Sequence, residues 1–317
     1  QNSTNTRIQE VFKDMRFVHA RRQPPNILRQ LSSAAFIQGD TEKNPGVYLC
    51  GRSNCKICEM YLQPCKTFKH VAEMITKRSI VSNNDKEIIL SGFRPFDISE
   101  TEIDVTGSLD IVSLEETFAT IPIANNNATN GLKINCLSAT GHINIVNITF
   151  IGQNTIMNMN NNNNKYDKLL LSNSLLEFNS SAVSINYCTF KNWNNINSIL
   201  KMNDYKLSIG DNFFSSYIVS DTIFVDNIAN KLIATEYLSN NATTIINSCT
   251  FIRNNVLQPK RLSSLIEVSS SAVTVNNCTA INCDNLLNIV DTNIIFISAS
   301  KFKNVSKVIT LSSSTLL

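Results

Sequence analysis

A short segment that ends in an anchor residue recurs along the C-terminal two thirds of the chain, and this repetition constrains the fold more than any other feature. Imperfect repetition at such a period is typical of stacked supersecondary units, in which no single unit buries its apolar face alone. The anchors lie 40, 34, 27, 29 and 22 residues apart. They are Phe150, Phe190, Phe224, Phe251, Ala280 and Phe302.

Two of these segments match each other over sixteen positions without a gap: LLEFNSSAVSINYCTF, which ends at Phe190, and LIEVSSSAVTVNNCTA, which ends at Ala280. Within the first, apolar and polar residues alternate with the period of a β-strand. This alternation predicts that Val183 and Ile185 point inward and that Ser184 points outward.

The residues that share a repeat position predict bends and interior rows. We expect a bend at the recurring asparagine, because Asn tolerates left-handed backbone conformations. The asparagines are Asn186, Asn247 and Asn276. We expect the recurring cysteines to be small interior hydrophobes rather than ligands or bridges. These are Cys188, Cys249 and Cys278.

The repeat pattern resembles the right-handed parallel β-helix of pectin-lyase-like proteins. The resemblance implies an all-β solenoid over residues 81–317, preceded over residues 1–80 by a small, mainly helical or irregular region that contains cysteines. One coil would take about 22 residues, the shortest step between anchors. Longer steps would absorb loops, such as the Asn-rich run at 157–168. Stacked coils would place the anchor phenylalanines, including Phe302, in one internal ladder.

The sequence contains no complete active site of the enzymes that use this fold. A polygalacturonase-like site would need paired aspartates and a Gly-His-Gly element. Gly141 and His142 have no second glycine, so we expect His142 at the surface or at a corner. We therefore predict a non-catalytic repeat protein that contacts protein or carbohydrate partners, and an active carbohydrate enzyme is an alternative.

Charge separates the two regions. Residues 1–80 carry 13 Lys/Arg against 6 Asp/Glu, whereas residues 81–317 carry 15 against 19. The run 7–20 has the apolar spacing of an amphipathic helix. Arginines follow it at Arg21, Arg22 and Arg29. They form either a solvated surface or a phosphate-binding face.

Four cysteines lie close together at spacings C-x4-C-x2-C-x6-C: Cys50, Cys55, Cys58 and Cys65. The first three could converge on one ion, and Cys65 or His70 could complete a tetrahedron, which suits one structural zinc. Reduced thiols, or two disulfides in an extracellular protein, are the alternatives.

Residues 15–68 resemble the cysteine-rich linker that precedes the GIY-YIG endonuclease in Penelope-like retroelements. The matching pieces are PNIL at 25–28 and CGRSNCKIC at 50–58. The resemblance implies nucleic-acid contact by the basic residues Arg21, Arg22, Arg29, Arg52 and Lys56. No GIY-YIG nuclease follows, so catalysis is not implied. A retroelement-derived nucleic-acid-binding protein without its nuclease is the second alternative function.

Localisation stays open in the sequence. No apolar run approaches about 18 residues, so we expect no membrane-spanning segment. The chain begins with Gln1, so we expect a fragment, a fusion or a processed product. An extracellular or cell-surface location suits the repeat region, and an intracellular one would apply if the basic region is functional.

Overall fold

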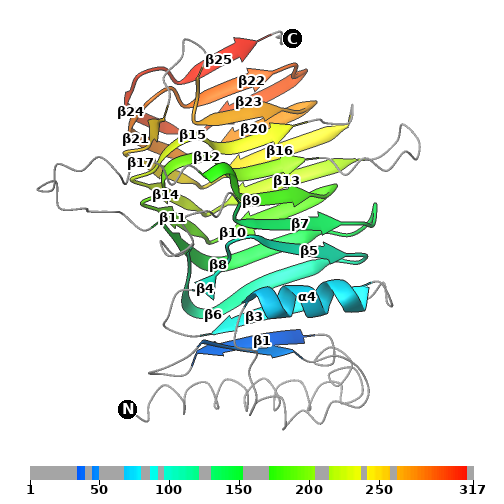
Figure 1. Cartoon of the computed structure of the whole chain (residues 1–317). Helices are drawn as coiled ribbons and strands as arrows, with labels where there is room; N and C mark the ends of the chain where they lie inside the picture. Colours follow the sequence, from blue (N-terminus) through cyan, green and yellow to red (C-terminus); the bar gives the residue numbers. More distant parts are fainter. Residues whose placement is uncertain are drawn as a thin grey trace, which may run out of the picture.

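The computed structural model describes residues 34–39, 45–49, 68–79, 86–91, 96–120, 130–152, 171–203, 214–236, 241–257 and 263–312. These residues are mostly β-strands, which stack along one axis from β1 to β25 (Figure 1). All described strand pairs are parallel except the antiparallel pair of β1 and β2. The expected all-β class is therefore confirmed.

The described strands form two sheets. The larger sheet contains β1 (Ala34–Gly39), β2 (Pro45–Leu49), β3 (Lys86–Ser91), β4 (Phe96–Asp97), β6 (Leu109–Thr120), β8 (Ile143–Ile151), β10 (Ala182–Asn186), β11 (Thr189–Lys191), β13 (Ser215–Ser220), β14 (Ile223–Val225), β16 (Ala242–Asn247), β17 (Thr250–Ile252), β20 (Ala272–Asn276), β21 (Thr279–Cys283), β23 (Ile294–Ser298) and β24 (Lys301–Val305). The smaller sheet contains β5 (Thr101–Val105), β7 (Leu132–Cys136), β9 (Leu171–Asn179), β12 (Asn194–Asn203), β15 (Ile228–Glu236), β18 (Asn255–Val256), β19 (Ile266–Ser269), β22 (Leu287–Val290) and β25 (Ile309–Ser312).

The anchor phenylalanines of neighbouring strands stack on one another, as the repeats predict. Phe150, Phe190, Phe224 and Phe251 are buried, and successive ring centroids lie 4.8, 5.1 and 5.2 Å apart in nearly parallel planes. Phe302 is in register with Ala280, which interrupts the row of rings, and it packs partly buried against the core. Val183 and Ile185 are buried, as expected, and Ser184 between them is half-buried.

The bends differ from the prediction by one residue. Asn186, Asn247 and Asn276 end extended strands, so their assignment to left-handed backbone was wrong. The following residues carry the positive φ: Tyr187 (55°), Ser248 (53°) and Asn277 (52°).

An interstrand hydrogen bond accompanies each of these bends. The Tyr187 N–H donates to the Ser220 carbonyl at 3.2 Å, and the Ser248 N–H donates to the Asn276 carbonyl at 2.9 Å. These bonds offset the cost of the left-handed conformation, which is about 1–2 kcal/mol for a residue with a Cβ. Tyr187 itself is 64% exposed, so a large side chain meets no obstacle at the bend.

One helix, α4 (Phe68–Ser79), packs against β5 beside the first strands of both sheets (Figure 1). Phe68, Val71 and Ile75 recur at three- and four-residue steps and are buried in the common core. The Thr76 hydroxyl accepts the backbone N–H of Asp104 at 3.0 Å, which ties the helix to the edge of β5.

The N-terminal region also contributes strands that the sequence did not predict. β1 pairs in parallel with β3, so elements from both sides of residue 80 share one sheet. The division of the chain at residue 80 stays a prediction. The Asn-rich run at 157–168 lies outside the described residues, and no described helix is long and apolar enough to cross a membrane.

Candidate functional site

The residues that the sequence singled out for metal or nucleic acid cannot be placed. Cys50, Cys55, Cys58 and Cys65 lie outside the described residues, as do Arg21, Arg22, Arg29, Arg52 and Lys56. His70 belongs to α4, but its side chain is not among those described. Elsewhere in the described residues, no group of three or more His, Cys, Asp or Glu could hold a metal ion. The zinc site therefore stays a prediction.

The outer face of the smaller sheet carries a row of alternating charges, which we call the charged row. The parallel register places Glu102 of β5 beside Lys133 of β7, Lys133 beside Glu177 of β9, and Glu177 beside Lys201 of β12. In each strand the flanking residues are buried, and all of them except Thr101 are apolar, for example Ile103 and Ile134. The period of two therefore fixes these charges on the outside.

A second row, the amide row, lies two residues further along the same strands. Asn135 donates from Nδ2 to the Asp104 carboxylate at 2.6 Å. Asn179 donates to the Asn135 Oδ1 at 2.6 Å, and Asn203 donates to the Asn179 Oδ1 at 2.9 Å. All three amides donate in the same direction along the stack. Asn203 Oδ1 ends the row buried, and no hydrogen-bond partner for it is found among the described residues.

Ion pairing perturbs the first pair of the charged row. Lys133 Nζ lies 2.8 Å from Glu102 Oε1, which also accepts the Asn135 amide at 2.8 Å. These two hydrogen bonds lower the pKa of Glu102, and the bond to Glu102 raises the pKa of Lys133. Both side chains are largely solvated, so the pair contributes little to stability.

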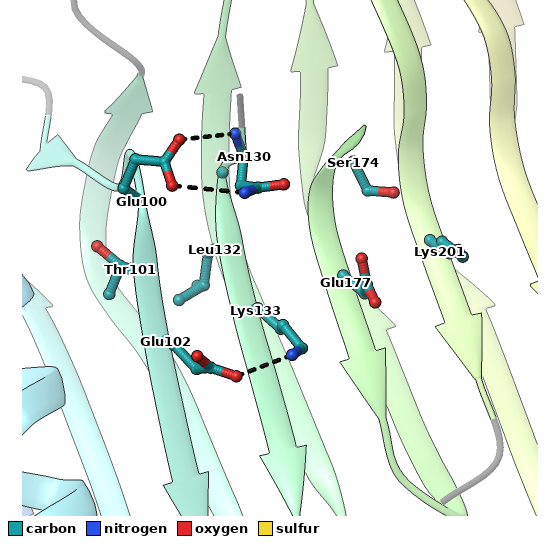
Figure 2. Close-up of a pocket in the computed structure, with 10 residues that line it drawn as sticks. Glu100, Thr101, Glu102, Asn130, Leu132, Lys133, Ser174, Glu177 and Lys201 are labelled. Carbon is teal, nitrogen blue, oxygen red and sulfur yellow. Dashed lines mark hydrogen bonds and ion pairs between the residues drawn. The ribbon is translucent and has the colours of Figure 1, made fainter. Parts of the chain in front are cut away.

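A pocket of about 460 Å³ opens over the charged row, beside the first residues of β5 and β7 (Figure 2). Its charged and polar lining residues are Glu100, Glu102, Glu177, Lys133, Lys201, Asn130, Thr101 and Ser174. Glu100 accepts hydrogen bonds from Asn130 through its backbone N–H at 3.0 Å and its side-chain amide at 3.4 Å. Figure 2 shows these two residues across the pocket from Ser174, Glu177 and Lys201.

Gly131 lines the pocket and lies close to the backbone of β9. Its N–H donates to the Ser174 carbonyl at 3.1 Å, and a Cβ at this position would clash with the Leu175 carbonyl oxygen. Any other residue would force β7 and β9 apart at the pocket floor. Ser174 also lines the pocket, and its neighbours Leu175 and Leu176 are fully buried in the core.

His142 lies at the surface, as the sequence predicts, in a small cluster with Ser108 and Asp110. Its Nδ1 lies 2.9 Å from the Ser108 hydroxyl, whereas Nε2 lies 3.8 Å from the Asp110 carboxylate. A nucleophile-activating triad needs a hydrogen bond on both sides of the imidazole. The second distance exceeds hydrogen-bond range, so His142 and Asp110 are not hydrogen-bonded in this structure.

The cysteines of the repeat region are buried free thiols, as expected, among them Cys188, Cys249 and Cys278. Burial raises the pKa of Cys188 to about 12, so its thiol stays protonated at neutral pH.

Sequence reasoning missed the pocket. The signal was present in the strand sequences TEIDV and LKINC, where charged and apolar residues alternate. Their pairing was hidden because a long connection separates the two strands in the chain.

Comparison of the chain with family models, with curated proteins and with solved structures finds no match in any of the three. The proposed function therefore depends on the geometry of the described residues.

Proposed function

We propose that the chain is a right-handed parallel β-helix that acts as a non-catalytic interaction or structural module at a cell surface or in the extracellular space. The order of the strands supports the β-helix. From β3 onward the chain alternates between the larger and the smaller sheet, and strands of successive passes pair in parallel. Like residues therefore stack on like, as in the phenylalanine row, which is the arrangement expected of a solenoid.

The charged row and the amide row together carry the functional proposal. They present binding groups in register across β5, β7, β9 and β12, at the spacing of neighbouring strands, roughly 4.8 Å. A regularly spaced polar surface of this kind suits an extended partner with its own repeating polar groups. Such a partner is a carbohydrate chain or an extended protein segment.

Binding of the full chain to a panel of immobilised polysaccharides and extracellular proteins tests this proposal. The row variant combines Glu102→Gln, Lys133→Gln and Glu177→Gln, and we expect it to lose binding by at least tenfold. The control variant combines Lys301→Gln and Lys303→Gln, which replace exposed charges on β24 of the other sheet, and it should retain binding. Turnover of a bound polysaccharide, seen as new reducing ends or unsaturated products, would overturn the non-catalytic assignment.

A nucleic-acid-binding role for residues 1–80 is the second candidate, and the net charge of +7 together with the CGRSNCKIC motif supports it. Fluorescence anisotropy with labelled DNA and RNA should then show binding that weakens steeply with salt. Zinc bound to the purified reduced protein should approach one ion per chain and should be lost in Cys55→Ser and Cys58→Ser. A reduced sample free of zinc would contradict the metal site, and binding independent of salt would contradict the nucleic-acid role.

A further inference from the structure

Ser174 is the pocket residue whose chemistry the stacked fold does not use. The residue is 3% exposed, and its Oγ is buried without a hydrogen-bond partner among the described residues. A buried hydroxyl without a partner destabilises a folded protein, because the group has lost its hydrogen bonds to water. An alanine would avoid this cost, so the hydroxyl needs a reason outside the folding of β9.

Charged residues of both signs line the same pocket as Ser174. Glu177 follows Ser174 in β9 and is in register with Lys201 on β12, while Glu100 lies across the pocket beside Asn130 (Figure 2). Glu177 accepts one hydrogen bond of 3.3 Å, from the Asn203 amide. Its carboxylate has further acceptor positions for a ligand.

The described lining contains no aromatic side chain, and Leu132 is its single large apolar residue. Pockets that take apolar or aromatic ligands are lined mainly by hydrophobic and aromatic groups. The volume of about 460 Å³ falls within the range of small-molecule sites. A ligand that fits is therefore small and polar and carries both a positive and a negative charge.

We propose that the pocket binds a small zwitterion, a free amino acid or a short peptide. The ligand ammonium lies against the Glu177 carboxylate, the ligand carboxylate lies against the Lys201 ammonium, and the Ser174 hydroxyl completes the site with a hydrogen bond. This inference rests on the proposed interaction function, because the pocket is part of the surface formed by the charged row.

Isothermal titration calorimetry of the full chain with glycylglycine tests the proposal. Glycylglycine should bind, and N-acetyl-glycylglycine and glycylglycine amide should each bind at least tenfold more weakly, because each lacks one charge. Ser174→Ala and Glu177→Gln should also weaken binding at least tenfold. Glu267→Gln is the matched control, since Glu267 continues the same outer row on β19, pairs with Lys231 and lies outside the pocket lining.

Thermal unfolding of Ser174→Ala separates a binding role from a packing role. We expect its midpoint to equal or exceed that of the parent chain while binding is lost, because an unpartnered hydroxyl has been removed. The proposal is overturned if glycylglycine does not bind, if the capped dipeptides bind equally well, or if Ser174→Ala leaves binding unchanged. Binding of a neutral disaccharide such as maltose in place of glycylglycine would overturn the zwitterion but leave the proposed interaction function standing.

Discussion

Asn254 makes several side-chain hydrogen bonds inside the described core, and its replacement should lower the free energy of unfolding. Asn227 and Asn254 occupy the same position three residues after successive anchors, and both are fully buried. Asn254 donates to the Phe224 carbonyl at 2.9 Å. Its Oδ1 accepts the Asn227 backbone N–H at 3.2 Å and the Asn227 side-chain amide at 2.9 Å.

Asn254→Ala removes these three bonds and a fourth, longer one from the Asn254 amide to Cys283 Sγ at 4.0 Å. The Asn227 amide keeps a second acceptor, the Phe190 carbonyl at 3.0 Å, so its loss is partial. The Asn227 N–H and the Phe224 carbonyl lose their Asn254 partner inside the core. At about 1–3 kcal/mol for each buried group left unsatisfied, the free energy of unfolding should fall by roughly 4 kcal/mol. This is a large part of the about 5–15 kcal/mol that stabilises an ordinary domain.

Urea and thermal unfolding followed by far-UV circular dichroism measure the effect. Asn254→Leu should lose about as much stability as Asn254→Ala, because it restores the volume but none of the bonds. Asn255→Ala is the control, since the adjacent asparagine has an exposed side chain. If Asn254→Ala and Asn255→Ala unfold at the same midpoint, the argument from buried hydrogen bonds is refuted.

Three further predictions follow from the interior and from the charged row. Phe224→Ala should lower the free energy of unfolding by about 3–5 kcal/mol, measured by urea denaturation, because the ring is buried between two others; Phe214→Ala, at a site 79% exposed, should change it by less than about 0.5 kcal/mol. Cys188 should not react with a thiol reagent at pH 8 until the chain unfolds, and rapid labelling of the native protein would contradict its burial. Lys133→Met should raise the pKa of Glu102 toward its ordinary value, which NMR titration measures. In the parent chain the Glu102 carboxylate provides a small stabilisation above its unfolded-state pKa, and this stabilisation is lost as the pH falls through the lowered folded-state pKa; it should be smaller in the variant. An unchanged titration would exclude the ion pair.

The interior was the part of the fold most open to prediction. The sequence assigned three residues to the inside: Val183, Ile185 and Phe190. This was possible because the alternation within a strand and the repeated segment can both be read from residues that are close together in the chain. The bends were displaced by one residue, from Asn186 to Tyr187, because the left-handed residue is held by a backbone hydrogen bond to the next strand rather than by its own side chain.

The repeats were sufficient to predict stacked strands with an internal row of phenylalanines, because like residues recur at equivalent positions of each repeat. Which outward side chains meet depends on the tertiary structure. Glu100, Ser174 and Lys201 are far apart in the chain, and the connections between their strands vary in length, so no local pattern aligns them. The register of β5, β7, β9 and β12 brings them to one pocket, and an unpartnered hydroxyl can be recognised only once every neighbour is in place.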